Sequence, residues 1–165
     1  MPDSVPDSVP DFAPDSHPEA ALLEEGDRLA RFMAQRLPAT LRDQARLSLI
    51  GRSLAVNLVN AFVPTVEHVT RHAGRPLHAQ LTTDEWGRAL VQVITPDGEE
   101  HDRLPVDDLL RDLLTVRGQW HPAVWEKVQD AVTGSEHHAT RALADALRSK
   151  AVLTALQRQL QLLLR

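Results

Sequence analysis

Apolar residues in the first part of the chain recur at helical spacing. A helix is predicted to begin near Pro18, because Ser16 and Glu19 have capping-box spacing and proline favours a first helical turn. Gly26 weakens its middle, and Pro38 ends it. The residues near its apolar face are Leu22, Leu29, Met33 and Leu37.

The next segment, "PATLRDQARLSLIGRSLAVNLVNAFV", predicts one or two helices, with Gly51 as the candidate break. A further short helix is expected from Pro64 to His72, before the stop formed by Gly74, Arg75 and Pro76. The apolar stripe of the longer segment consists of Leu47, Ile50, Leu54, Leu58 and Phe62.

The pattern then changes to that of β-strands. In "LHAQL", apolar and polar residues alternate, as in a half-buried strand, and "RALVQVIT" is rich in β-branched residues. "TPDGEE" supplies a turn, and the short polar "EEHDR" predicts an edge strand. Together these segments predict a small antiparallel meander of three strands.

Helical patterns return at "LPVDDLLRDLLTVRG", with Gly118 as its expected C-cap, and continue in "HPAVWEKVQDAVTG". A last helix is predicted from a cap at Ser135 to the end of the chain, without interruption. Its apolar face is unfinished where the sequence stops, so we expect a second protomer or another protein to cover it. The predicted interface residues are Leu153, Leu156, Leu160 and Leu163.

These patterns predict an α+β fold with a helical N-terminal part, a three-stranded antiparallel sheet and a helical C-terminal part. Residues 18–165 are expected to form one domain. Residues 1–17 predict a disordered tail, because proline at every fourth position interrupts a helix at each turn and Phe12 is the one bulky apolar side chain there.

The charge distribution argues against nucleic acid and anionic membranes as partners. The chain carries a formal charge of −5, with 23 acidic and 18 basic residues. Residues 1–19 contain five acids and no Lys or Arg, which leaves 23 − 5 = 18 acids against 18 bases in the remainder. A neutral body with 4% aromatic residues is a poor match for a nucleic-acid surface.

A cytoplasmic location is expected from three features of the sequence. The chain has no cysteine, which fits a reducing compartment. It shows no pattern of a signal peptide, and its longest apolar stretches are shorter than a membrane span.

Two histidines are the candidate metal ligands. His68 and His72 in "EHVTRH" are one helical turn apart and can share a face, as zinc ligands do. Glu67 precedes both histidines instead of lying between them, so the metalloprotease pattern is absent, and a third ligand would have to come from His78 or a distant acid. The alternative is a pair of surface histidines near the C-terminus of a helix.

No catalytic constellation is recognisable in the sequence. The seven glycines are scattered singly, so there is no glycine-rich phosphate loop, and no Gly-x-Ser-x-Gly elbow occurs. Paired acids such as Glu24-Glu25, Glu99-Glu100 and Asp107-Asp108 are typical of solvated faces. We therefore expect no cofactor and no catalytic activity of the chain on its own.

Three stretches together resemble the N-terminal region of the aerobactin-type siderophore synthetases, which work independently of nonribosomal peptide synthetases. They are "SLAVNLVNAFV", "ALVQVITPDGEEHDRLPVDDLLRDLL" and "VWEKVQDAVTGSEHHATRALADAL", within residues 50–150. The family has a His-rich segment before the second strand that "TTDEWGRA" lacks, and its motifs for ATP and carboxylates lie further along than this chain extends. The resemblance therefore implies a non-catalytic or accessory module and transfers no functional residue.

The sequence thus favours a non-enzymatic cytoplasmic protein-interaction or oligomerisation domain that acts through amphipathic helices, as a homodimer or with a protein partner. One alternative is a truncated or accessory N-terminal module of a siderophore synthetase. Another is a small-molecule or metal sensor that uses the face of His68 and His72.

Overall fold

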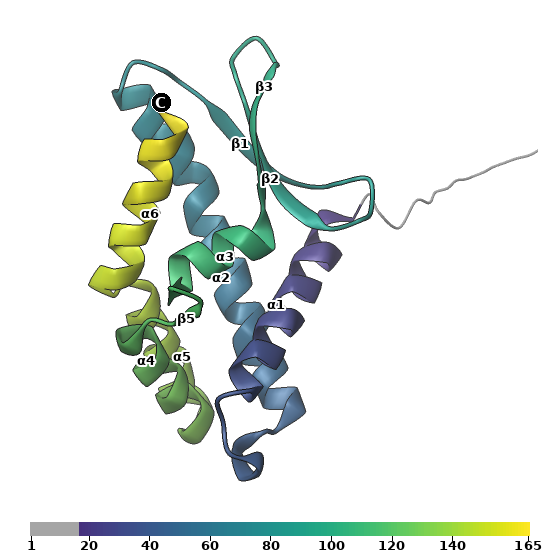
Figure 1. The fold of residues 1–165 in the computed structure, drawn as a ribbon, viewed down its shortest axis with the longest axis vertical. Coiled ribbons are helices and arrows are strands. Elements are labelled where there is room, and N and C mark those ends of the chain that lie inside the picture. The colour runs from purple at the N-terminus through teal and green to yellow at the C-terminus, as the bar shows by residue number, and fades with distance from the viewer. Residues whose placement is uncertain (1–16) are drawn as a thin grey trace, which may run out of the picture.

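The computed structural model describes residues 17–165, whose fold is α+β as the sequence predicts (Figure 1). The N-terminal part contains α1 (Pro18–Ala34), a 3-10 turn, η3 (Ala39–Leu41), and α2 (Gln44–His72). The sheet contains β1 (His78–Thr83), β2 (Ala89–Ile94) and β3 (Glu100–Pro105). The C-terminal part contains α3 (Val106–Leu114), the short strands β4 (Thr115–Val116) and β5 (Gln119–Trp120), then α4 (Pro122–Thr133), α5 (Glu136–Leu147) and α6 (Lys150–Leu163). The predicted tail, apart from His17, lies outside the described residues.

Helix α2 is the central helix of the fold, with α1 on one side of it and α4, α5 and α6 on the other (Figure 1). Of the one or two helices expected around Gly51, the structure has one, and the separate helix expected from Pro64 to His72 is instead the last part of α2. Asp43 caps its start by accepting a hydrogen bond from the Arg46 backbone N–H at 3.2 Å. Pro64 deprives the carbonyl of Asn60 of its helical partner, but Asn60 is exposed, so water can replace that hydrogen bond.

Gly51 lies where α1 crosses α2, and the need for close approach explains why glycine is present inside this helix. A β-carbon on Gly51 would lie 2.2 Å from the carbonyl oxygen of Gly26, and one on Gly26 would lie 2.5 Å from the α-carbon of Arg52. The two helices therefore pack backbone against backbone at this crossing.

The predicted meander is confirmed, with strand order β1-β2-β3 and antiparallel pairing throughout. Val91 and Val93 of the central strand are fully buried in the core, while Gln80 and Gln92 pair on the outer face at 2.9 Å. The first four residues of β3 are exposed, as expected for a polar edge strand.

The C-terminal part departs from the prediction at two places. The helix expected up to Gly118 ends at Leu114, and a tight β4–β5 hairpin follows, in which Arg117 and Gly118 have positive φ angles of 54° and 79°. The long final helix is divided into α5 and α6, because the Ser149 hydroxyl accepts a hydrogen bond from the Val152 N–H and starts a new helix. The predicted cap at Ser135 is confirmed by its bond from the His138 N–H.

Most of the buried apolar residues belong to one continuous core, built from α1, α2, the inner face of the sheet and the C-terminal helices. Among the described helices, α2 is long and apolar enough to cross a membrane by length and composition, contrary to the expectation from the sequence. The central helix of a folded core has the same composition, and 44% of its most apolar 18-residue window is buried inside this fold.

Candidate functional site

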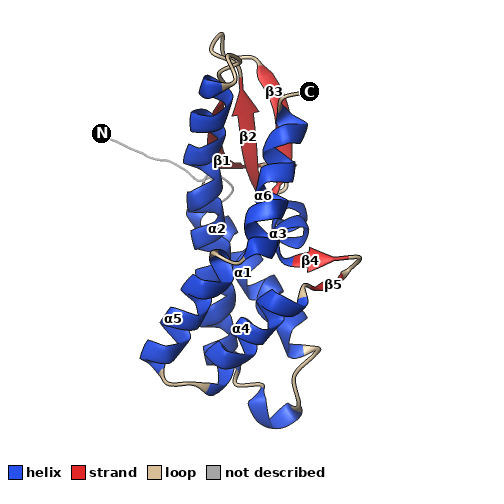
Figure 2. Ribbon diagram, turned by 90° about the vertical axis from the view of Figure 1, so that its left-hand side faces the viewer, coloured by secondary structure: helices blue, strands red, loops and turns tan. Residues whose placement is uncertain are grey.

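An apolar groove of about 530 Å³ lies between α2 and α5, and it is the strongest candidate site in the described part of the chain. Helix α5 lies beside the N-terminal half of α2 (Figure 2). Leu49 stands at the groove with 69% of its surface exposed, although it is a large apolar side chain on a well-packed helix. The apolar lining consists of Leu49, Ile50, Ala139, Leu143, Ala144 and Leu147.

Helical periodicity explains how the two helices form the groove. On α2 the lining residues Leu49, Ser53 and Asn57 are four residues apart, and on α5 Glu136, Ala139 and Leu143 are three or four apart. Each set lies along one face of its helix. Helix α2 therefore has two neighbouring faces: one packs in the core, and the other lines the groove.

Arg46 fixes the start of α5 against the start of α2. Its guanidinium donates to the carbonyl of Ala131 at 2.9 Å and also to the carbonyl of Gly134. These carbonyls end α4 just before α5 begins, so Arg46 satisfies backbone acceptors that the helix leaves free. The two helices consequently run in the same general direction along the groove.

The ionisable residues that line the groove are Asp43, Arg46 and Glu136, and all three lie at its N-terminal end. Arg46 is engaged with backbone carbonyls, and Asp43 caps α2. Neither arrangement brings a general base to a nucleophile. The groove presents apolar surface with a polar rim, which is the form of site that receives an amphipathic helix.

The predicted metal ligands lie together, but no third ligand joins them. The ring centroids of His68 and His72 are 4.4 Å apart near the end of α2. Glu67 bonds instead to Arg71 at 3.1 Å and to Nδ1 of His78 at 3.2 Å. Within residues 17–165 there is no group of three His, Cys, Asp or Glu side chains placed to hold a metal ion.

The predicted interface on the last helix is divided between core and surface. Leu160 and Leu163 are 5% and 3% exposed and belong to the chain's own core. Leu156 is partly buried against that core, and Leu153 is 52% exposed. Helix α6 therefore packs against its own chain. Most of the apolar face for which the sequence predicted a partner is buried in this way.

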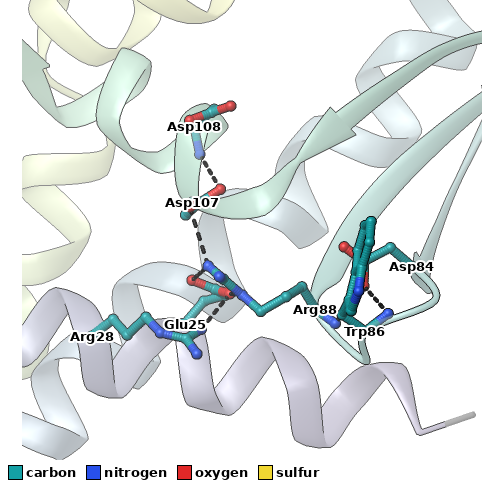
Figure 3. Close-up of polar contacts among 7 residues, drawn as sticks. All are labelled: Glu25, Arg28, Asp84, Trp86, Arg88, Asp107 and Asp108. Carbon is teal, nitrogen blue, oxygen red and sulfur yellow. Dashed lines mark hydrogen bonds and ion pairs between the residues drawn. The ribbon is translucent and has the colours of Figure 1, made fainter. Parts of the chain in front are cut away.

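The buried carboxylate of Glu25 is the centre of a polar cluster away from the groove (Figure 3). It is 2% exposed and accepts from Arg28 at 2.7 Å and from Arg88 at 2.9 Å. Arg88 also donates to Asp107 at 3.1 Å, and its hydrogen bond to Glu25 raises the pKa of the Arg88 guanidinium. The cluster joins α1, the start of β2 and α3. Two acids and two arginines balance one another, so it is a structural clamp.

The turn between β1 and β2 lies beside this clamp and carries Trp86, which is 78% exposed (Figure 3). The Asp84 carboxylate accepts from the backbone N–H groups of Trp86 at 2.9 Å and of Arg88 at 2.8 Å. These two hydrogen bonds stabilise the turn, and the Arg88 side chain extends toward the clamp. Trp86 borders a shallow hollow with the first turns of α1.

Sequence reasoning missed both the groove and the clamp. The apolar pattern predicts that the stripe through Leu47 and Ile50 is core, but nothing in the pattern separates an exposed Leu49 from a buried one. Glu25 lies in a pair of acids that is typical of a solvated face, and its partner Arg88 is far along the chain.

Comparison with known proteins adds no neighbour: no family model matches the chain, and no curated protein or solved structure shows significant similarity to it. The resemblance to siderophore synthetases therefore stays a prediction.

Proposed function

We propose that residues 17–165 form a non-enzymatic cytoplasmic protein-interaction domain, which binds an amphipathic helix in the groove between α2 and α5. The observation that carries the proposal is the exposure of Leu49 directly at an apolar groove. Covering one leucine contributes roughly 1.5–3 kcal/mol, so a partner that buries Leu49 and the groove lining gains a substantial part of a specific affinity.

The dimensions of the groove support a helical ligand. Its α2 side extends from Asp43 to Asn57, which at 1.5 Å per residue is roughly 20 Å, or about four helical turns. The small side chains of Ala139 and Ala144 allow a third helix to approach closely. An amphipathic helix presents apolar residues at i, i+3, i+4 and i+7, which match such a length.

The experiment is a selection from a displayed library of amphipathic helices, with the purified chain immobilised at low density. We expect the selected clones to share the i, i+3, i+4, i+7 apolar pattern and to lose binding to the Leu49→Asp variant. Leu153→Asp is the matched control, because Leu153 is similarly exposed but lies outside the groove lining. Clones that bind Leu49→Asp as well as the wild type would contradict the proposal.

A further inference from the structure

We infer that the occupant of the groove is the same groove of a second copy of this chain, related by two-fold symmetry with the helices antiparallel. This inference rests on the proposed function, since it names the helices that the groove receives. It differs from the sequence-based prediction, which placed the dimer contact on α6.

The direction of the two helices makes the groove self-complementary. Because Arg46 ties the start of α5 to the start of α2, both N-termini lie at one end of the groove and Asn57 and Leu147 lie at the other. A two-fold axis across the middle of the groove would place α2 and α5 antiparallel to their copies. The result is a four-helix bundle, whose helices pack by the usual side-chain interdigitation.

The charges along the groove favour this antiparallel arrangement. The N-terminal end carries Asp43, Arg46 and Glu136, and because the Arg46 guanidinium is held by the carbonyls of Ala131 and Gly134, the two carboxylates are left to face a partner. Arg148, the exposed C-cap residue of α5, follows Ala144 by four residues and lies just beyond the groove lining at the other end. In the antiparallel dimer each acidic end meets the Arg148 of the other copy. A parallel pairing would place the two acidic ends together and is disfavoured by repulsion.

Glu136 and Arg148 are available for this contact. Within residues 17–165 neither side chain takes part in an ion pair in its own protomer, whereas Arg52, Arg71 and Arg88 do. Without residues 1–19 the chain is formally neutral, so two copies of the body carry no net repulsion.

The steric pattern agrees with the charges. Leu49 projects from one side of the groove, and the small residues Ala139 and Ala144 line the other. Across a two-fold axis the Leu49 side chain of each copy can enter the groove of the other copy and contact its α5. Both copies then bury the same large exposed side chain.

The test is charge reversal with rescue, in the full chain, with the mass measured by light scattering at high micromolar concentration. We expect the wild type to have the mass of two chains, and Glu136→Lys and Arg148→Glu each to shift it toward that of one. The double variant Glu136→Lys/Arg148→Glu should restore the dimer, because each reversed charge again meets its opposite across the axis. Circular dichroism of each variant verifies the fold.

Two further variants separate the groove from the rest of the surface. Leu49→Asp and Thr140→Lys both alter exposed groove residues, and each should give a folded monomer. Leu162→Asp is the control, because Leu162 is exposed on α6, outside the groove lining, and the dimer should persist.

A wild type that is monomeric at this concentration would overturn the inference, as would a double variant that is not rescued. If the selected helices still bind in a Leu49-dependent manner, the groove is an interaction site for another protein and the proposed function stands. If they do not, the proposed function fails as well.

Discussion

Gly26 and Gly51 meet where α1 crosses α2, and a β-carbon on Gly51 would lie 2.2 Å from the Gly26 carbonyl oxygen. The atom that blocks such a β-carbon is a backbone atom of a helix, so it cannot move aside as the end of a flexible side chain can. The crossing therefore depends on glycine at both positions, and α2 tolerates glycine inside a long helix for this reason.

We expect Gly51→Ala to destabilise the fold, although alanine is the better helix former by about 1 kcal/mol. The added methyl group must separate two packed helices, and overpacking of this kind costs typically about 1–3 kcal/mol, so we expect a result at or above the upper end of that range. Urea unfolding measures the change in free energy. Asn60→Ala, at an exposed site of the same helix, is the control and should change stability by less than about 0.5 kcal/mol. Equal stability of Gly51→Ala and wild type would show that the helices do not approach so closely.

The clamp around Glu25 should respond unequally to the loss of its two arginines. Arg88 ties Glu25 to a strand and a helix far along the chain, whereas Arg28 is three residues away on α1. Arg88→Met leaves the buried carboxylate less satisfied and should cost about 1–3 kcal/mol. Arg28→Met should cost less, about 0.5 kcal/mol, as is usual for local pairs.

A double-mutant cycle with Glu25→Gln tests the coupling. The combined Glu25→Gln/Arg88→Met variant should be more stable than the sum of the single effects indicates, because the second change removes a charge that the first left without its partner. Additive effects in urea unfolding would contradict the clamp.

The sequence predicted the elements whose signal is local, and it missed what depends on contacts between distant segments. Pro18 in the first turn of α1, the β-branched run of β2 and the serine cap of α5 determine structure within a few residues, and these predictions are confirmed. The continuity of α2 through Gly51 depends on α1, which no local rule contains. The burial of Leu160 depends on the fold-back of α6 at Ser149, and the apolar stripe alone reads the same whether a partner or the chain itself covers it.

The ion pair of Asp27 predicts a loss of stability in acid. The Arg52 guanidinium, at 2.8 Å, and the Ser48 hydroxyl, at 2.5 Å, donate to this carboxylate and lower its pKa in the folded state. Asp27 therefore binds a proton less readily in the folded state than in the unfolded chain, where an aspartate titrates at about pH 4. The contribution is present above that pH and is lost as the pH falls through the lower folded pKa.

Asp27→Asn should accordingly lower the unfolding free energy at neutral pH, and its difference from the wild type should shrink below about pH 4. Glu100→Gln is a useful comparison, because Arg103 also lowers the pKa of Glu100 but both side chains of that pair lie at the surface. Its effect should be smaller and should vanish in high salt. A constant difference between wild type and Asp27→Asn across the acidic range would contradict the assignment.

The histidine pair predicts weak metal binding. His68 and His72 supply two nitrogens, and a tight zinc site takes three or four protein ligands. Calorimetric titration of zinc into the wild type and into His68→Ala/His72→Ala should give similar, weak heats. A tight site that disappears in the double variant would restore the sensor hypothesis.

The leucines of α6 have two different environments, and charged substitutions at them should have different effects. Leu160 is 5% exposed and packs in the core, whereas Leu153 is 52% exposed on the same helix. Leu160→Asp buries a charge without a partner and should unfold the domain or lower its melting temperature severely. Leu153→Asp changes a solvated position and should leave both the melting temperature and the mass unchanged, since the proposed dimer contact lies in the groove between α2 and α5.

Circular dichroism on heating and light scattering of each variant measure the two effects. If Leu153→Asp instead yields a well-folded monomer, the second copy docks on α6, as the apolar stripe of the sequence suggests. If Leu160→Asp remains folded with an unchanged melting temperature, the α6 face is not part of the core. Leu160→Met is the conservative control, because it keeps the volume and the apolar character and should cost less than about 1.5 kcal/mol.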